Sequence, residues 1–311
     1  MKTANHYNIV FTVIEGSHIM SKDTSMEYLT QDEKRAILQK NLALTEEDLL
    51  KMDPVEFRAR VRERSHHTLE IQVYQAAYRN RTLSAKQADY TKWLLEIWKK
   101  KGLSEELPEY RYAKKLIGFA DALSKGKPVD LEPYRPTPVT EEMEKDFFTI
   151  LKERRSVREF KEIEVPDELI DKILDAGLWA AHGCNIQSIR YIVVREKNAP
   201  GLFAGSDVPG GPVHLVILQD MRNYRANSFT PRRNQLLDAG AAGQNIVLAA
   251  HAVGLEGVWL TFNEAMCKRL TEYFKLPEYI RLVTYVDVGY GDQTPYPPQR
   301  WDVEDTILAR I

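Results

Sequence analysis

Apolar residues in the first 130 positions recur at helical spacing among many charged ones. The run from Asp53 to Glu56 supplies an N-cap, a proline at the first helical position and a glutamate placed to close a capping box, so a helix should begin there. The run from Ser84 to Gln87 repeats this pattern, and Gly102 offers a C-terminal stop after an apolar stripe of Tyr90, Leu94, Ile97 and Trp98. This half of the chain is therefore predicted to be helical.

Prolines interrupt the helical pattern between Pro133 and Pro138. Such a run cannot continue a helix and favours an extended connection. We therefore expect three segments, which are a helical N-terminal extension over residues 21–132, a proline-rich linker over residues 133–139 and a second domain over residues 140–311.

The first twenty residues are set apart by their sequence. The run from Ile14 to Met20 is typical of an expression-vector scar ahead of a second start at Met20, so residues 1–20 are expected to be an expression tag or a disordered segment. A native strand from Ile9 to Ile14 is the alternative. No functional prediction rests on this segment.

After the linker, helical patterns alternate with short β-branched runs. Thr140 and Pro166 each open an amphipathic helix, with apolar stripes of Met143, Phe147, Ile150 and Leu151 in the first and Leu169, Ile170, Ile173 and Leu174 in the second. Strands are expected over residues 190–194, 213–218, 257–260 and 282–288. Residues 234–253 are apolar almost all round and include small residues, which predicts a buried central helix. The expected class is α+β, with a central mixed or antiparallel sheet flanked by helices.

Composition narrows the function classes. The chain has 43 basic and 45 acidic residues, so no global charge favours nucleic acid or anionic lipid. Two cysteines are too few for a disulfide framework or a cysteine-rich zinc site, which favours a reducing, cytoplasmic compartment. The adjacent pair His66 and His67 diverges on a helix, and no metal site is expected. Apolar runs are shorter than the roughly 20 residues that span a bilayer.

Arg154, Arg155, Ser156 and Arg158 place three guanidiniums and a hydroxyl within five residues, here called the arginine cluster. Arginine side chains match phosphate oxygens bidentately and stay charged, so a phosphate monoester is a natural ligand. The alternative is a basic helix terminus that complements the helix dipole and pairs with Glu153 or Glu159.

A polar loop, residues 180–187, follows the helix that Pro166 opens; it is called the Asn185 loop below. Asn185 and Gln187 are two apart, so on an extended backbone both would offer donors and acceptors on one side, suited to a ribityl chain or a flavin ring edge. Gly183 permits close approach of a ligand to the backbone. The alternative is a turn whose side chains satisfy their own backbone.

These segments, together with a late arginine, Arg300, resemble the nitroreductase family in order and spacing. The resemblance covers roughly residues 147–301. It is carried by the arginine cluster with Glu159 and Phe160, Asn185-Ile186-Gln187 and the following strand, Asp238 to Asn245, Gly254 to Trp259, and Val288-Gly289-Tyr290.

The resemblance implies a nitroreductase-like fold and a homodimer with FMN at the subunit interface. Arg154, Arg155, Ser156, Arg158 and Arg300 would grip the FMN phosphate and the pyrimidine end of the flavin. Six residues of the Asn185 loop would reach the flavin from the partner subunit: Ala181, His182, Gly183, Cys184, Asn185 and Gln187. Leu260 and Thr261, at the end of the strand that starts at Gly257, would lie near N5 and O4 of the flavin ring.

The implied reaction takes hydride from NADH or NADPH through flavin N5 to a nitroaromatic, a quinone or a related small acceptor by a ping-pong mechanism. His182 could donate a proton to the acceptor or serve only as a spacer. Cys184 is a small loop residue, and His214 and His251 are expected to be satisfied core histidines.

The chain departs from the family pattern Pro-Ser-x-x-Asn-x-Gln-Pro-Trp, because Ala181, His182, Ser188 and Ile189 replace its proline, serine, proline and tryptophan. The segment between Val194 and Asp238 is also short for a substrate lid, so the N-terminal helices could supply that cover. Two alternatives follow. One is a specialised dehydrogenase or reductive dehalogenase whose N-terminal half recognises a larger substrate. The other is a non-catalytic protein that binds flavin or a partner.

Overall fold

Asp53 begins helix α3 (Pro54–Arg64) as predicted, because its carboxylate accepts hydrogen bonds from the backbone N–H groups of Val55 and Glu56. The side chain of Glu56 does not return to the cap but lies 3.5 Å from Arg225 in a later segment. The computed structural model describes residues 30–83, 85–206 and 210–311. The expected tag over residues 1–20, the alternative strand and the cap at Ser84 lie outside these ranges.

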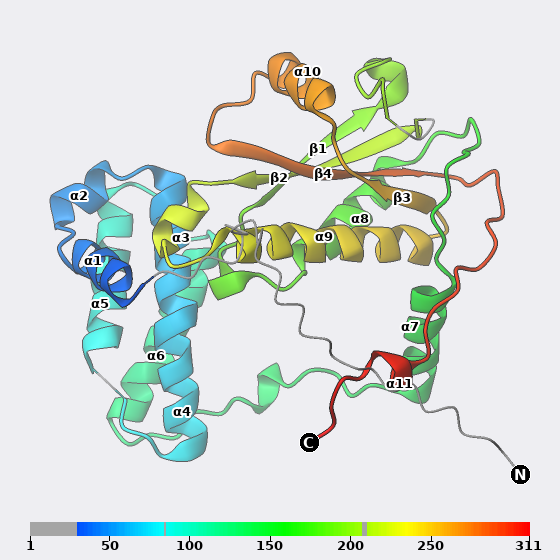
Figure 1. Cartoon of the computed structure of the whole chain (residues 1–311). Coiled ribbons are helices and arrows are strands. Elements are labelled where there is room, and N and C mark those ends of the chain that lie inside the picture. The colour runs from blue at the N-terminus through cyan, green and yellow to red at the C-terminus, as the bar shows by residue number, and fades with distance from the viewer. Residues whose placement is uncertain (1–29, 84, 207–209) are drawn as a thin grey trace, which may run out of the picture.

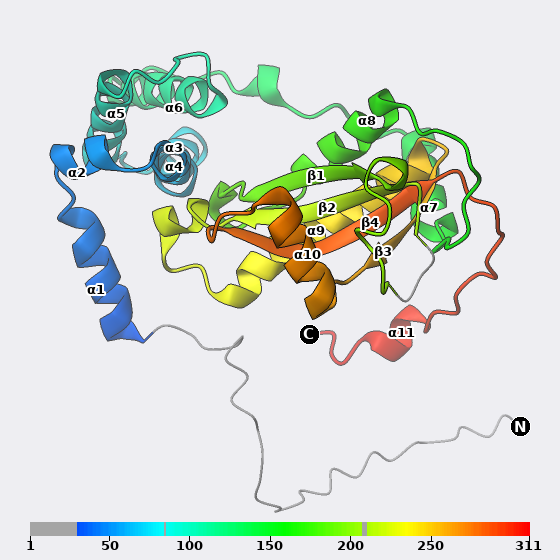
Figure 2. The same cartoon turned by 90° about the horizontal axis from the view of Figure 1, so that it is seen from above.

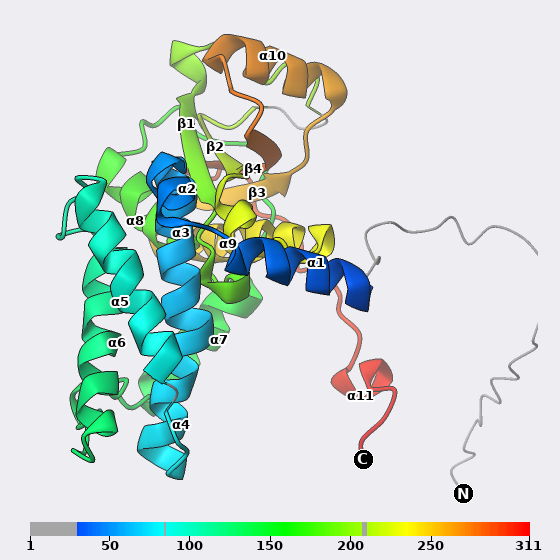
Figure 3. The ribbon, with the colours of Figure 1, turned by 90° about the vertical axis from the view of Figure 1, so that its left-hand side faces the viewer.

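The N-terminal part is helical, as the periodicity predicts (Figure 1). Its elements are α1 (Gln31–Leu42), α2 (Glu46–Lys51), α3, the π-helical turn η2 (Ser65–Glu70), α4 (Ile71–Arg79), α5 (Ala85–Lys100) and α6 (Pro108–Ser124). Helices α3 and α4 run through η2 as one continuous column beside α5 and α6 (Figure 3). Trp98 is fully buried at the centre of this part, with its ring centroid 6.1 Å from that of Phe57 and 5.9 Å from that of Tyr110. The extension therefore has a hydrophobic core of its own.

A short 3₁₀ turn, η3 (Glu132–Tyr134), and an extended run connect α6 to α7 (Glu141–Glu153). Thr140 caps α7 as predicted, by accepting a hydrogen bond from the Met143 N–H. No residue of α7 is buried within the single chain, and its apolar face exposes Met143, Phe147, Phe148 and Leu151. The stripe predicted from the sequence is present, but residues 30–83, 85–206 and 210–311 leave it uncovered.

The four predicted strands form one antiparallel sheet. They are β1 (Ile189–Arg195), β2 (Val213–Asp220), β3 (Glu256–Leu260) and β4 (Ile280–Gly289), in the order β1-β2-β4-β3. Every residue of β2 is buried, which fits its central position and its run of β-branched and aliphatic residues. This arrangement confirms the predicted α+β class.

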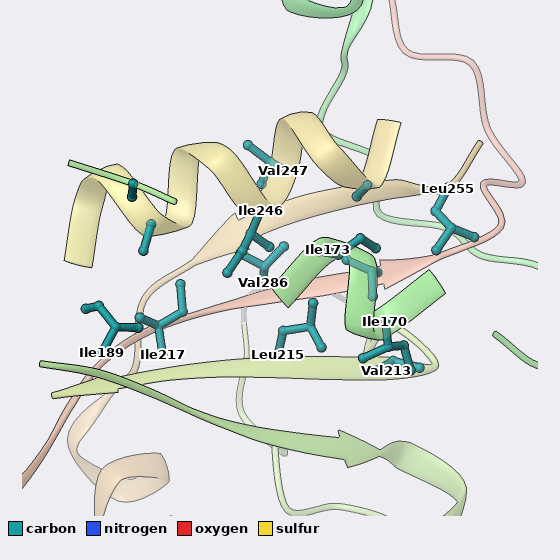
Figure 4. Packing of buried hydrophobic residues seen from close by; sticks show 14 of the residues in the cluster. Ile170, Ile173, Ile189, Val213, Leu215, Ile217, Ile246, Val247, Leu255 and Val286 are labelled. Atoms are coloured by element: carbon teal, nitrogen blue, oxygen red, sulfur yellow. The ribbon is translucent and has the colours of Figure 1, made fainter. Parts of the chain in front are cut away.

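Helices cover both faces of the sheet (Figures 1 and 2). On one face lie α8 (Asp167–Leu178) and α9 (Arg232–Ala252), whose side chains Ile173, Ile246 and Val247 pack against Leu215 and Val286 of the sheet (Figure 4). On the other face, α10 (Glu264–Phe274) contributes Met266 and Leu270 to a second core. Shorter elements complete the chain: η4 (Gly183–Asn185), η5 (Glu196–Asn198), η6 (Asn223–Asn227) and α11 (Val303–Thr306).

Helix α9 is the predicted central helix, but only one of its faces is buried. Ala239, Ala242 and Ile246 face the sheet, whereas Leu236 and Leu237 are exposed on the single chain. The expectation of burial all round is therefore wrong for one chain, because none of the residues that the structure describes covers Leu236 and Leu237. Within the described ranges, no helix combines the length and the apolar character needed to cross a membrane.

Gly243 explains the small residues in α9. A Cβ atom there would lie 2.8 and 2.9 Å from two ring atoms of Trp259, which packs across the helix from β3. The Trp259 indole also donates a 2.6 Å hydrogen bond to the Thr284 hydroxyl, so the ring is held against the helix. Glycine is required here for close packing, as the sequence predicted for this stretch.

Gly243→Ala is therefore expected to destabilise the protein by about 1–3 kcal/mol, the usual range for overpacking a filled site. Gly118→Ala is the matched control, since Gly118 lies in α6 with open space around its Cα. That change should stabilise the helix by about 0.5–1 kcal/mol. Urea denaturation of both variants measures the difference, and equal effects would contradict the packing of Trp259 on α9.

His214 is a buried core histidine, as predicted. Its Nδ1 lies 2.5 Å from Asp287 of β4 and its Nε2 lies 3.0 Å from Glu196 of η5, while its ring stacks on Phe203 at a centroid distance of 3.9 Å. Burial lowers the pKa of His214, but the hydrogen bonds and charges of Asp287 and Glu196 outweigh it, so the pKa is raised overall. His251 is half-buried and contacts Glu256 at 3.2 Å.

The raised pKa of His214 predicts a pH-dependent stability. In the unfolded chain histidine titrates near pH 6.5, so the contribution of the charged ring is complete below about pH 6.5 and is lost as the pH rises through the raised folded value. The melting temperature should therefore contain a component that falls with rising pH above neutrality. His214→Gln should remove this component, and His67→Gln, at an exposed helical position, should retain it.

Candidate functional site

The arginine cluster begins where α7 ends. Ser156 pairs with Gly257 in a parallel β-bridge, the Val157 N–H donates to the Gly257 carbonyl at 3.3 Å, and Phe160 pairs with Gly291. These contacts hold the cluster beside the start of β3 and the end of β4. The fold therefore fixes residues 154–158 against one end of the sheet.

Arg300 lies close to this cluster although it is 146 positions from Arg154. Burial lowers the pKa of half-buried Arg154, and the positive charges of Arg155 and Arg300 lower it further, while Glu256 raises it. Arg155 donates its Nη1 to the backbone carbonyls of Lys152 and Arg154 at 2.7 and 3.0 Å. The charges of Arg155 and Arg300 thus act on Arg154 against a single opposing carboxylate, which is an arrangement that an anion would stabilise.

The alternative interpretation of the cluster is supported only in part. Arg155 does bond the last carbonyls of α7, as a helix terminus would require. Arg158, which is exposed, directs its Nη1 to the Ser156 carbonyl at 3.4 Å and its backbone N–H to the Gln293 side chain at 2.5 Å. In the described part of the chain, neither arginine pairs with Glu153 or Glu159.

The Asn185 loop has a backbone that differs from the predicted extended one. Cys184, Asn185 and Gln187 have φ values of 51°, 52° and 52°, in the left-handed region that residues other than glycine rarely adopt. The side chains of Asn185 and Gln187 nevertheless lie together, because the side-chain amide of Gln187 donates to the side-chain oxygen of Asn185 at 2.7 Å. The prediction of an extended backbone was wrong, but the two side-chain amides do lie on one side of the loop, as predicted.

Such backbone conformations persist only where the surroundings hold them. The Gly183 N–H donates to the carboxylate of Asp238 in α9 at 2.9 Å, and Tyr224 donates to the other oxygen of that carboxylate at 2.6 Å. Ser188 and Gln219 in turn donate to the Tyr224 hydroxyl at 2.9 and 3.0 Å. This buried network ties the loop to the sheet and to α9.

Arg62 of α3 holds the other side of the loop. Its Nε donates to the Asn185 carbonyl at 3.0 Å and its Nη2 to the Ile186 carbonyl at 2.8 Å. The same guanidinium pairs with Glu109 of α6 at 2.5 Å and bonds Asn223 at 3.1 Å. The N-terminal extension is thus bonded directly to the loop for which flavin contact was predicted.

The remaining candidates of this loop occupy its surface or its inner wall. Ala181 is exposed, and Cys184 is half-buried, with Asn227 donating to its sulfur at 3.2 Å. Burial raises the pKa of the Cys184 thiol, which argues against a reactive thiolate. His182 Nδ1 lies 2.9 Å from the Ala180 carbonyl, so this nitrogen carries the proton. Its Nε2 is buried and has no partner among the described residues.

Leu260 and Thr261 end β3 beside the Trp259 ring. Leu260 is half-buried, and its carbonyl accepts a hydrogen bond from Thr284, while Thr261 is exposed. Leu260 is the last residue of β3 and Thr261 follows it, and the first residues of this strand contact the arginine cluster. Strand β3 therefore runs from the arginine cluster at its first residues to these two candidates at its last, with Trp259 packed against Gly240 and Gly243 of α9.

A single chain separates the predicted site into two halves. The Asn185 loop is held by Asp238 near the start of α9, whereas the arginine cluster lies beside Glu256, which contacts His251 at the end of that helix. Asp238 and His251 are 13 residues apart, a distance of about 20 Å along the axis of an α-helix. One chain therefore does not bring the loop and the cluster together.

Sequence reasoning missed three residues of this region. Asp238 stood within a family-like segment without a role, and Arg190 lay in a predicted strand. Arg62 gave no signal at all, because its partners in the loop are 123 and 124 positions away. Long-range hydrogen bonds of this kind leave no local pattern in a sequence.

Comparison with known proteins agrees with the resemblance. The model of the nitroreductase family matches residues 151–204 and 202–290. A Methanothermobacter thermautotrophicus protein, provisionally named as an NADH dehydrogenase/NAD(P)H nitroreductase, is 31% identical over 172 residues, which cover 53% of this chain and 87% of that protein. The NADPH-flavin oxidoreductase of Vibrio harveyi is 27% identical over 45% of this chain and 64% of its own length.

Among solved structures, a provisionally named nitroreductase of Desulfovibrio desulfuricans in complex with FMN is 28% identical and covers 53% of this chain and 96% of its own, with a TM-score of 0.46. The chain belongs to the nitroreductase family, which confirms the prediction from the sequence, and it is an oxidoreductase. The helical extension precedes the first residue that the family model matches.

Proposed function

We propose that the protein is an FMN-dependent reductase that uses NADH or NADPH to reduce a nitroaromatic, a quinone or a related small organic acceptor by a ping-pong mechanism. The observation that carries the proposal is the arginine cluster, which the Ser156 and Val157 contacts with Gly257 hold against the sheet, where the charge of Arg300 also acts on Arg154, a donor set that fits a phosphate dianion. The names of the relatives, which include a flavin oxidoreductase, support the same cofactor.

The residues present fit FMN in chemistry. Ser156 and Arg158 would add a hydroxyl and a further guanidinium to the phosphate anchor, and Leu260 with Thr261 would border the ring. When bound, FMN supplies the hydride chemistry, and the protein supplies position and charge. Cations near the pyrimidine end would stabilise negative charge there. His182 acts as a spacer in this proposal, because its only proton in the neutral form is committed to the Ala180 carbonyl.

A second copy of the chain would complete the site. The Asn185 loop and the arginine cluster lie at opposite ends of α9, so the loop of one protomer would meet the cluster of its partner. The uncovered apolar residues Met143, Phe147 and Leu151 on α7, with Leu236 and Leu237 on α9, offer the surface on which such a dimer would form. This supports a homodimer with FMN between the subunits.

Phe147→Glu is expected to weaken the dimer, since it places a charge in the centre of the exposed α7 stripe, where Phe147 is 54% exposed. Sedimentation velocity should show a shift from dimer to monomer, and FMN should be lost with it. Tyr78→Glu is a matched control, because Tyr78 is 69% exposed in the N-terminal part. A wild-type protein that is monomeric at high concentration would overturn the proposed assembly.

Stopped-flow mixing tests the activity directly. The FMN-loaded protein is mixed with NADH or NADPH without oxygen, and absorbance near 450 nm is followed. Rapid bleaching, then recovery on addition of a nitroaromatic or a quinone, is the expected result. A protein that binds FMN yet is bleached by neither nucleotide would contradict the reductase proposal and favour a non-catalytic flavin protein.

A further inference from the structure

A cavity of about 570 Å³ lies where the N-terminal helices meet the Asn185 loop. Helices α3 and α6 contribute Arg58, Arg62 and Glu109 to its lining, and the opposite wall includes Gln187 and Arg190. Its volume falls within the range of roughly 300–1,000 Å³ that is usual for small-molecule sites. The family model begins at residue 151, so the first three of these residues belong to the part of the chain that it leaves unmatched.

Positive charge dominates the lining. Three guanidiniums, those of Arg58, Arg62 and Arg190, face one carboxylate, Glu109. Arg62 and Arg58 share this carboxylate at 2.5 and 2.9 Å, so it cannot balance a third cation. Because the cavity is lined by an excess of positive charge, an anionic group would be stabilised within it.

The three arginines differ in their remaining capacity to bind. Arg62 donates hydrogen bonds to Glu109, to Asn223 and to two backbone carbonyls of the loop, so its role is to connect these segments. Arg190 donates its Nη1 to the carbonyls of Gln187 and Ile189, and its other guanidinium nitrogens bond no acceptor in the described ranges. Arg58 donates to Glu109 through Nη2, and its Nη1 bonds no acceptor among the described residues. Arg190 and Arg58 therefore retain donors for a ligand.

We infer that this cavity binds a carboxylate or phosphate group of a ligand that also reaches the flavin, with Arg190 and Arg58 as the binding residues. The inference rests on the proposed function, because Asn185 and Gln187 line the cavity and belong to the loop proposed to contact FMN. The anionic group belongs either to the acceptor or to the nicotinamide nucleotide, and both present the same chemistry to the two arginines.

Electrostatics within the cavity agree with this role. Burial lowers the pKa of Arg190, and the charges of Arg58 and Arg222 lower it further, while Asp220 and, to a smaller extent, Glu109 raise it. Asp220 is itself paired with Arg222 at 2.6 Å, so it is not available as a full partner of Arg190. A bound anion would relieve the repulsion between the arginines, which a purely structural cluster would leave in place.

The test compares the FMN-loaded wild type with Arg190→Gln and with Arg58→Gln. Arg111→Gln is the matched control, since Arg111 is exposed on α6 and its ion pair with Glu106 spans 3.9 Å. Steady-state KM is measured for 4-nitrobenzoate and for neutral 4-nitrobenzyl alcohol, and then for NADPH and NADH. Isothermal titration with 4-nitrobenzoate and inorganic pyrophosphate gives a readout that does not require turnover.

Loss of Arg190 should raise KM or Kd for the anionic ligand by about ten- to a hundredfold, the range for hydrogen bonds to a charged group. The neutral analogue should change less than about twofold. If only the affinity for 4-nitrobenzoate falls, the bound anionic group belongs to the acceptor. If only the affinities for NADPH and pyrophosphate fall, the group belongs to the nucleotide. Unchanged binding of every anion in both variants overturns the inference. Failure to hold FMN would appear separately in the absorbance spectrum and would count against the proposed function alone.

Discussion

Replacing Arg62 by alanine is expected to destabilise the protein by about 3 kcal/mol, near the lower end of the range for breaking a buried ion pair, because Glu109 keeps Arg58 as a partner. The change also leaves the buried carbonyls of Asn185 and Ile186 without their donor. Since the Asn185 loop is held in left-handed conformations, it should become mobile as well. Thermal unfolding and hydrogen exchange of residues 183–188 measure the two effects.

Arg62→Lys separates charge from geometry. Lysine retains the positive charge beside Glu109 but cannot direct a planar fork at two carbonyls, so an intermediate loss of stability is expected. Arg111→Ala, on the exposed face of α6, should change stability by less than about 0.5 kcal/mol. If Arg62→Ala were as stable as this control, the connection between the extension and the loop would have no energetic role.

Arg154→Gln is expected to weaken FMN binding by about ten- to a hundredfold, because one charge-assisted phosphate contact contributes about 1.5–3 kcal/mol. Arg154 is half-buried and repelled by Arg155 and Arg300, so its charge is unlike that of a solvated surface arginine. The fold should be retained, since the backbone contacts of the cluster pass through Ser156 and Val157. Fluorescence titration of the apoprotein with FMN measures the affinity.

Arg310→Gln is the control for this prediction. Arg310 is exposed near the C-terminus and pairs with Glu304 at 2.7 Å, and its charge is not among those that shift the pKa of Arg154. The FMN affinity of the Arg310→Gln variant should equal that of the wild type. If Arg154→Gln bound FMN as tightly as the wild type, the arginine cluster would be a helix terminus and not a phosphate anchor.

The elements of the fold were accessible from the sequence because local chemistry determines them. Thr140 and Asp53 have the side chains that cap helices, and both do so. The four strands lie where β-branched runs predict them, within one or two residues at each end. Trp259 against Gly243 gives the physical reason for the small residues in α9, which the sequence could identify without naming the partner.

Other features depend on contacts that no local pattern encodes. The left-handed backbone at Cys184, Asn185 and Gln187 escaped prediction because none of the three is a glycine. The anchors of this loop, Arg62 and Asp238, come from elements distant in sequence. The exposure of the apolar stripe of α7 and the one-sided burial of α9 were equally hidden, since an apolar stripe has the same pattern whether its own chain or another covers it.

The structure shows what replaces the proline of the family pattern in the Asn185 loop region. Ser188, at the position of a family proline, is buried and donates to Tyr224, which holds Asp238 and through it the Gly183 backbone. The N-terminal extension packs on the other side of this loop through Arg62. We therefore propose that the extension shapes the substrate site, in keeping with a specialised member of the family.

The absorbance spectrum of the purified protein, followed by identification of the released chromophore, tests the central claim most directly. The account predicts flavin bands near 370 and 450 nm and FMN, at one molecule per chain, as the released compound. A colourless protein that takes up no FMN on titration would contradict it, because the arginines that converge beside β3 would then hold no phosphorylated cofactor.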